Sequence, residues 1–382
     1  MSTDELRLGI GGPLYRVERA ARVERVRRLI PLLIAVTWVP LCVFALVQWA
    51  RRGASDSLIR DWSVHGRLLV AMPVIVSAER LLDQIARVAL ARVFDEELVP
   101  PASAPKVRAM LRAVERWRDA AWFESLLLVA ALVVGIASLV GWIPTSGVLA
   151  GSGTYRYDGV RLWYGLVSLP IFQLILWRSL FRFALWLRVL VGLARTPLAL
   201  IATHADRHGG IAFLRMPSIV YGALLLLATS AVLCGGWATE IAKRGVPMAT
   251  FRSPFLVFVV LGVVVVLVPL LMFTPQLWRA RVVGLRRYGG LVTDYARRFQ
   301  TRWIESGDRT ALLGTPDIQS LSDLLNAYQH SVAELGTMLF GKRDIVVVAA
   351  AALLPAVPLL FLEGPAHEVV KRVARLLLGA LP

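Results

Sequence analysis

The chain has 382 residues, of which 57% are hydrophobic, with twelve tryptophans and a mean hydropathy of +0.63. Soluble domains are about half apolar, so this composition excludes an ordinary water-soluble domain of this size. The formal net charge of +17 would suit a nucleic-acid-binding protein. The basic residues lie between long apolar stretches, however, where they indicate membrane topology instead.

Seven apolar stretches follow one another along the chain. A helix that crosses a hydrocarbon core of ~30 Å needs roughly 20 mostly apolar residues. We therefore predict an all-α fold, a polytopic integral membrane helix bundle of about seven transmembrane helices. The second stretch is the least apolar, because Glu79 and Arg80 directly follow its apolar part, Leu68–Ser77, and a re-entrant segment is the alternative there. The predicted spans are 29–50, 65–85, 121–143, 162–186, 211–235, 254–273 and 345–362.

The distribution of positive charge predicts the orientation. With the N-terminus inside and the C-terminus outside, 31 Lys and Arg residues face the cytoplasm and 12 face the other side, as the positive-inside rule requires. The predicted partners are the lipid bilayer and its anionic headgroups, and nucleic acid is not expected. The first apolar run is too long for a cleaved signal peptide. We therefore predict an uncleaved anchor and a multi-pass protein of the bacterial inner membrane.

Four segments are expected outside the hydrocarbon core. Residues 1–28 are predicted to be a cytoplasmic, amphipathic N-terminus, with an amphipathic helix at 14–28 on the cytoplasmic face of the membrane. Within residues 29–273, which hold the first six spans, a cytoplasmic helix pair is expected at 79–120. Residues 274–344 form a cytoplasmic helical segment before the span at 345–362, and residues 363–382 predict an amphipathic helix at the outer surface.

The cytoplasmic segment at 274–344 contains two apolar stripes with helical spacing. We expect these stripes to pack against each other in a small subdomain, or to form an oligomer contact. The first consists of Tyr288, Val292, Tyr295, Phe299 and Trp303. The second consists of Ile318, Leu321, Leu325, Tyr328, Val332, Leu335 and Leu339.

The segment Thr203–Gly210 (THADRHGG) concentrates polar chemistry in one short inner loop. Two imidazoles and a carboxylate are residue types that bind divalent metals, but no third histidine is near and the spacing fits no metalloprotease pattern. Two glycines before a helix would let an anion approach the backbone. The alternatives are a lipid-headgroup or phosphate site and a purely structural turn. The candidate binding residues are His204, Asp206, Arg207, His208, Gly209 and Gly210.

Four charged residues are predicted at membrane depth, near the cytoplasmic side. Arg178 and Arg182 lie four residues apart and therefore on one face of the fourth span. Glu124 begins the third span, and Glu79 closes the second. Charges in a bilayer are costly unless paired or hydrated. They predict either a polar vestibule in an ion path, or snorkelling arginines with a structural Glu–Arg pair.

The sequence shows no catalytic motif. A Walker A loop, G-x-S-x-G, H-E-x-x-H and C-x-x-C are all absent, so no catalytic residue, metal or cofactor is predicted. Prolines lie inside or at the start of six of the seven predicted spans, and broken helices of this kind can line cavities in transporters and channels.

Two segments carry a resemblance to a known group. His204–Leu214 (HADRHGGIAFL) and Asp317–Leu325 (DIQSLSDLL) resemble the corresponding segments of a widespread group of uncharacterised bacterial integral membrane proteins. That group often has Pro where this chain has Ala205, and His208 is outside its pattern. The resemblance implies a polytopic membrane fold over nearly the whole chain and no particular activity.

Three functions from different classes remain open at this point. The first is a channel-like or transporter-like protein that forms a homo-oligomer, which the membrane-depth charges and proline-broken spans favour. The second is a membrane-embedded enzyme or lipid-headgroup-binding protein that uses the loop of His204 and Asp206. The third is a membrane scaffold whose cytoplasmic helices bind protein partners.

Overall fold

The structure is a computed structural model that describes residues 15–16, 20, 26–52, 61–140, 142, 159–305 and 316–361. These residues form helices, turns and connecting loops, and no strand occurs among them. The all-α prediction is therefore confirmed for the described chain. Most of the predicted N-terminal helix at 1–28 and the whole predicted C-terminal helix at 363–382 lie outside the described residues.

Five helical stretches of the described chain are long and apolar enough to cross a membrane. They confirm a helical protein with apolar, membrane-length helices. The spans predicted at 65–85 and 162–186 are not among them, because these two stretches are more polar. The five stretches are Val26–Val47 (α2, Val26–Thr37, and most of α3, Val39–Arg52), Ala104–Val140 (α6, Ala104–Arg118, and α7, Ala121–Val140), Ala212–Arg244 (η6, Ala212–Leu214, and α10, Arg215–Arg244), Ala249–Leu271 (α11) and Lys342–Phe361 (α14, Lys342–Leu353, and η9, Leu354–Phe361).

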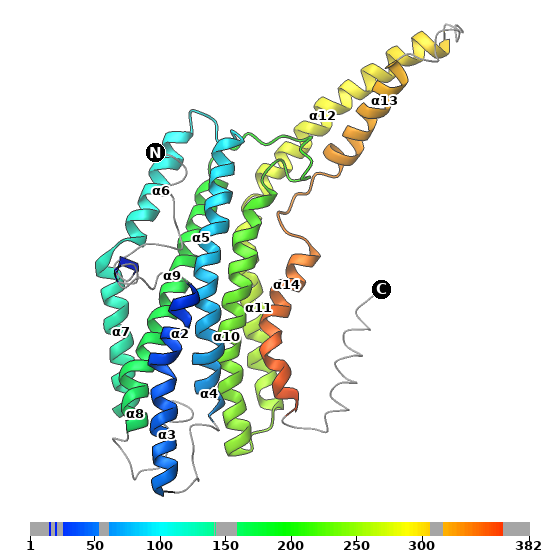
Figure 1. Ribbon diagram of the computed structural model, residues 1–382. Coiled ribbons are helices and arrows are strands. Elements are labelled where there is room, and N and C mark those ends of the chain that lie inside the picture. The colour runs from blue at the N-terminus through cyan, green and yellow to red at the C-terminus, as the bar shows by residue number, and fades with distance from the viewer. Residues whose placement is uncertain are drawn as a thin grey trace.

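The two more polar stretches are long helices at the centre of the bundle. One consists of α4 (Trp62–His65), the π-helical η3 (Gly66–Ala71) and α5 (Met72–Asp95). The other consists of α8 (Gly159–Trp163), the π-helical η5 (Tyr164–Ser168) and α9 (Leu169–Ala194). Both run in the same direction beside α10 (Figure 1). The second helix of the predicted pair at 79–120 is α6, whereas residues 79–95 continue the helix that starts at Trp62.

Close backbone contact joins α4 and η3 to α10. A Cβ atom on Gly235 would lie 2.7 Å from the carbonyl oxygen of Trp62, and one on Gly66 would lie 2.8 Å from that of Ala231. Only glycine fits at such distances, in the manner of the small-residue contacts of membrane helices. The contact holds the polar stretch that starts at Trp62 against α10.

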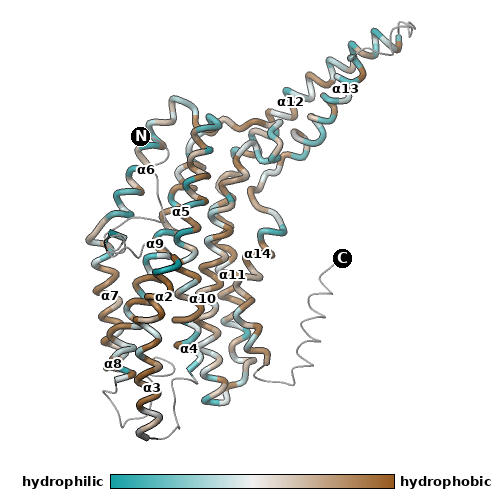
Figure 2. The backbone as a smooth tube through the Cα atoms, in the orientation of Figure 1, coloured by the Kyte–Doolittle hydropathy of each residue, from teal (hydrophilic) through white to brown (hydrophobic). Residues whose placement is uncertain are grey.

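The outer helices turn apolar side chains away from the bundle. In the apolar part of the stretch that contains α10, 56% of the residues are buried, whereas in the other four stretches 17–22% of them are buried. Figure 2 shows the brown, hydrophobic tube continuing along α7 and α11. A bilayer covers such a surface, and water does not. The exposed apolar residues of α11 include Leu256, Val257, Val260, Leu261, Val264, Val265 and Val268.

Side chains from α8 and η5 compensate for the proline at the start of α3. Pro40 has no N–H group, so the carbonyl of Val36 loses its helical partner. Trp163 Nε1 donates to that oxygen at 3.0 Å, and Ser168 Oγ donates to the carbonyl of Thr37 at 2.7 Å. This proline is therefore accommodated by a specific helix contact.

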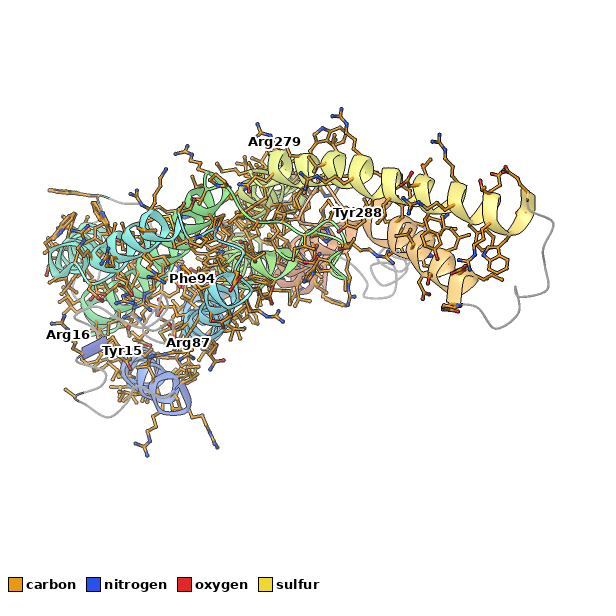
Figure 3. The ribbon with its side chains drawn as sticks, turned by 90° about the horizontal axis from the view of Figure 1, so that it is seen from above. Tyr15, Arg16, Arg87, Phe94, Arg279 and Tyr288 are labelled. Atoms are coloured by element: carbon orange, nitrogen blue, oxygen red, sulfur yellow. The ribbon has the colours of Figure 1, made fainter. Side chains whose placement is uncertain are left out.

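A two-helix arm extends from the bundle (Figures 1 and 3). It consists of α12 (Thr274–Phe299) with η7 (Gln300–Glu305), and of α13 (Pro316–Ala327) with η8 (Tyr328–Ala333). Trp303 Nε1 donates to Asp317 Oδ2 at 2.9 Å, and Tyr295 Oη donates to the carbonyl of Asp317 at 3.3 Å. Two residues of the first stripe, Tyr295 and Trp303, thus contact the start of α13, whereas Ile318 of the second stripe is exposed.

Candidate functional site

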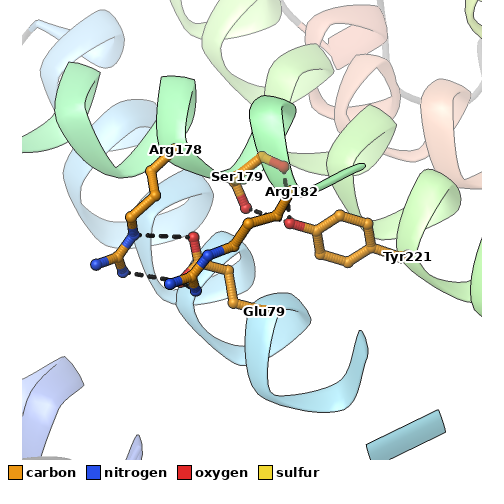
Figure 4. A network of polar contacts seen from close by, with 5 residues as sticks. All are labelled: Glu79, Arg178, Ser179, Arg182 and Tyr221. Atoms are coloured by element: carbon orange, nitrogen blue, oxygen red, sulfur yellow. Dashed lines mark hydrogen bonds and ion pairs between the residues drawn. The ribbon is translucent and has the colours of Figure 1, made fainter. Parts of the chain in front are cut away.

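Three charged side chains meet inside the bundle. Glu79 of α5 accepts hydrogen bonds from two arginines of α9 (Figure 4). Arg178 donates from Nε to Oε1 at 3.3 Å and from Nη2 to Oε2 at 2.8 Å, while Arg182 Nη1 donates to Oε2 at 2.8 Å. The three side chains are 3–5% exposed. We call Glu79, Arg178 and Arg182 the inner cluster.

The helices explain why these residues meet. Positions 178 and 182 lie one turn apart on the same face of α9, so both guanidinium groups reach the same side. Because α5 and α9 run side by side, that face meets Glu79. Charge-assisted hydrogen bonds of this kind are about twice as strong as neutral ones, and they offset the desolvation of the buried charges.

Hydroxyl groups extend the inner cluster toward α10. Tyr221 Oη donates to the carbonyl of Ser179 at 3.0 Å and lies 2.6 Å from Ser179 Oγ. Glu124, at the start of α7, is partly buried and attracts Arg182 electrostatically. The structure therefore joins three of the four predicted membrane-depth charges, Glu79, Arg178 and Arg182, through hydrogen bonds between α5 and α9.

A second polar layer, which the sequence analysis missed, lies near the other end of the same helices. Trp38 Nε1 donates to His65 Nδ1 at 3.1 Å, and Arg67 donates to the hydroxyl of Tyr164. We call Trp38, His65, Arg67 and Tyr164 the outer layer. Further along, the buried Asp61 accepts from the backbone N–H of Ser63 at 3.1 Å and begins α4.

Between the outer layer and the inner cluster, the chain from Gly165 to Trp177 carries two polar side chains besides its final tryptophan, Ser168 and Gln173. The intervening part of η3 and α5, residues 68–78, is almost entirely apolar. Gln173 lies five residues before Arg178 and nine before Arg182, so it lies on the opposite face of α9, the face that carries the exposed residues Leu180 and Ala184. Its Oε1 atom is buried and accepts no hydrogen bond from the described chain. A buried amide oxygen in this state is costly.

The predicted inner-loop residues form a compact turn around one carboxylate. Asp206 Oδ1 accepts from the N–H groups of His208 at 2.8 Å and Gly210 at 3.0 Å. Oδ2 accepts from the N–H of Ala212 at 3.0 Å, and His204 Nδ1 lies 2.9 Å from Oδ1. Partial burial would raise the pKa of Asp206, but these hydrogen bonds lower it below the ordinary value of 3.8.

The backbone of this loop requires the residues that the sequence supplies. Gly209 and Gly210 have φ values of 68° and 95°, in the region that favours glycine. Arg207 also adopts a positive φ of 56°. Both oxygens of Asp206 and both glycines are thus used to fold the turn. Among the described residues, no group of three or more His, Cys, Asp or Glu side chains is placed to hold a metal ion.

The same loop joins the bundle to the end of the arm. The N–H of Gly336, which lies between η8 and α14, donates to the carbonyl of Arg207 at 2.7 Å. The Arg207 side chain pairs with Glu334 at 2.7 Å, although both side chains are about half exposed. An exposed ion pair of this kind contributes little, so the backbone contact is the firmer connection.

Near the inner cluster lie buried polar residues that sequence reasoning did not find. Asp83 is buried one turn after Glu79, and the i, i+4 spacing of the two carboxylates was a readable signal. Tyr221 and Ser179 gave no such signal, because a Tyr or Ser in an apolar helix usually serves packing.

Comparison of the chain with known protein families, with curated proteins and with solved structures finds no significant match. The resemblance carried by the two segments stays a prediction.

Proposed function

We propose that the chain is a multi-pass membrane protein of the channel or transporter class, with its polar path along α5 and α9. The observation that carries this proposal is the buried carboxylate of Glu79, held by Arg178 and Arg182 inside an apolar bundle. Ionisable groups at membrane depth are rare, and they commonly mark substrate or ion pathways. The outer layer adds a second set of polar residues near the other end of the same helices.

The proposal includes seven spans, with the N-terminus inside and the C-terminus outside in a bacterial inner membrane. The helices Trp62–Asp95 and Gly159–Ala194 are each about 50 Å long at 1.5 Å per residue, longer than the ~30 Å hydrocarbon core. They face one another through their polar residues, through Arg67 with Tyr164 and Glu79 with Arg178. Helices in this position need less apolar surface than helices that face lipid.

Cysteine labelling tests the topology. A thiol reagent that does not cross membranes is applied to intact cells carrying Thr250→Cys or Ser320→Cys. Labelling of residue 250 in intact cells, and of residue 320 only after permeabilisation, is expected. The reverse pattern, or labelling of both residues in intact cells, would contradict the orientation.

The loop of His204 and Asp206 gives less support to a lipid-binding or enzymatic function. Its carboxylate accepts three backbone hydrogen bonds, and these already account for the polar residues of the turn.

A scaffold or oligomer function has one specific observation in its favour. The arm carries exposed apolar side chains, which include Leu291, Ile304 and Ile318, and such residues are typical of contact surfaces.

Ion and solute flux into proteoliposomes tests the proposal. The wild-type protein is compared with Glu79→Gln, which keeps the shape of the side chain but removes its charge. Glu240→Gln is the matched control, since Glu240 makes an i, i+4 pair with Arg244 near the end of α10. Flux that Glu79→Gln alters and Glu240→Gln preserves is expected. A folded, inserted wild-type protein without flux across a panel of ions and solutes would refute the proposal.

A further inference from the structure

The two arginines of the inner cluster form a fork-shaped receptor for a carboxylate. Arg178 approaches both oxygens of Glu79 from one side, and Arg182 approaches Oε2 at 2.8 Å from a position one turn further along α9. A planar carboxylate with two guanidinium partners is the arrangement by which proteins bind small carboxylate ligands. Here the carboxylate belongs to the chain itself.

We propose that Arg178 and Arg182 form a binding site for a small carboxylate solute, and that Glu79 occupies this site in the conformation of the structure. This inference rests on the proposed function and names the class of solute that moves along the path. The neighbouring hydroxyl of Tyr221, which lies beside Ser179, supplies a further polar group at the same depth.

Packing around the inner cluster sets the size of the solute. Trp186 follows Arg182 by one turn and is fully buried, with Nε1 donating to Ser218 Oγ at 2.8 Å. Leu82 and Ile75, which flank Glu79 on α5 at helical spacing, are also fully buried. The Glu79 side chain consists of two methylene groups and a carboxylate, so the space that it would vacate corresponds to a carboxylate of one to three carbons and is smaller than an aromatic carboxylate.

A tethered carboxylate is a natural competitor for a dissolved one. Glu79 is held near the arginines at an effective concentration set by its own helix, so a free carboxylate must compete with it. Arg80, the next residue along α5, also attracts Glu79 electrostatically. The wild-type protein should therefore bind a small carboxylate weakly, and a variant without the Glu79 carboxylate should bind it much more tightly.

Chemical rescue tests this site without any transport measurement. Glu79→Ala removes the tethered carboxylate and leaves its space beside the two arginines. Thermal unfolding of the purified variant is followed with formate, acetate, benzoate or phosphate, at equal ionic strength against chloride. Formate and acetate are expected to raise the Tm by about 2 °C or more at saturation. The wild-type protein should need at least about a tenfold higher concentration of formate or acetate for the same rise in Tm.

Two further variants serve as controls. Glu240→Ala removes a carboxylate that pairs with Arg244 near the end of α10 and should show no rise specific to carboxylates. Glu79→Ala combined with Arg182→Gln should lose the rescue. If Glu79→Ala does not fold in chloride, the recovery of folded protein in formate supports the site. The decisive comparison is then the rise in Tm at high formate in the wild-type protein and in its Arg182→Gln variant.

The outcomes separate this inference from the proposed function. A rise in Tm that is equal in chloride or benzoate, or that persists without Arg182, overturns the carboxylate site. So does the absence of any rise in both Glu79→Ala and the wild type. A rise confined to phosphate overturns the carboxylate assignment. A rise in Tm with formate, in a protein that shows no flux, would support the carboxylate site and refute the proposed transport function. Flux through a protein whose Glu79→Ala variant is not stabilised by formate would support transport and refute the carboxylate site.

Discussion

Removal of the Glu79 charge should destabilise the protein more than removal of either arginine charge. Glu79→Gln leaves two buried guanidinium groups without the carboxylate that accepts three hydrogen bonds from them. Breaking a buried ion pair by removing one partner costs about 3–5 kcal/mol. Arg178→Gln or Arg182→Gln leaves one carboxylate with one guanidinium. Each should therefore cost less, about 1–3 kcal/mol.

Equilibrium unfolding in mixed detergent micelles measures these differences, with Glu240→Gln as a matched substitution outside the inner cluster. The triple replacement Glu79→Leu, Arg178→Leu and Arg182→Met should recover most of the stability, because apolar residues of similar volume replace buried ion pairs at little cost. It should not recover flux. A free energy of unfolding for Glu79→Gln within about 1 kcal/mol of the wild type would refute the reasoning, and flux through the triple variant would refute a path at these residues.

Three more predictions concern the inner loop, the bundle and the arm. Asp206→Asn should lower the free energy of unfolding by about 2–3 kcal/mol at neutral pH. The pKa of Asp206 is lowered from 3.8 in the folded state, so the ionised carboxylate stabilises the fold fully above about pH 5. The difference between the variant and the wild type should therefore shrink as the pH falls through the folded-state pKa. Gly235→Ala should cost about 1–3 kcal/mol despite the better helix propensity of Ala, because its Cβ would meet the carbonyl of a neighbouring helix. Trp303→Ala should destabilise the arm locally by about 3–5 kcal/mol, measured by hydrogen exchange.

Each of these predictions has a control and a result that would contradict it. Limited proteolysis within residues 203–214 reports on the Asp206 variant, and a cost that grows toward low pH would be the wrong sign. Gly290→Ala on α12 meets no described atom within 4 Å and should be neutral or stabilising, so equal costs for both glycine variants would contradict the contact. Trp278 is exposed, and Trp278→Ala should leave exchange in the arm unchanged. Unchanged exchange in Trp303→Ala would show that the arm is not held by this contact.

The apolar helices could be predicted from the sequence because length and composition specify them. The span predicted at 254–273 corresponds to α11, and the one predicted at 345–362 corresponds to α14 with η9. The helix at 79–95 was misjudged as separate, although no Gly or Pro interrupts residues 74–95. Local patterns give the type of an element well. They do not tell a lipid-facing helix from one that neighbouring helices bury.

The candidate site was predictable in part. The i, i+4 spacing of Arg178 and Arg182 showed that they share a face, but nothing in the sequence joins them to Glu79, about a hundred positions earlier. That contact depends on which helices pack together. The loop of Asp206 had the opposite difficulty, because the residue types that bind a ligand are also those that cap a turn. Only the hydrogen bonds distinguish the two.

Water access to Ile175 tests the central claim most directly, because it requires no knowledge of the transported species. Ile175 is buried and lies about one turn before Arg178 on the face of α9 that carries both arginines. With Cys42 and Cys234 replaced by Ala, Ile175→Cys is treated in membranes with a small charged thiol reagent, and Val260→Cys on the exposed face of α11 serves as the lipid-facing control. A polar path along α5 and α9 predicts that residue 175 reacts much faster than residue 260. Equal protection of both residues would contradict the path.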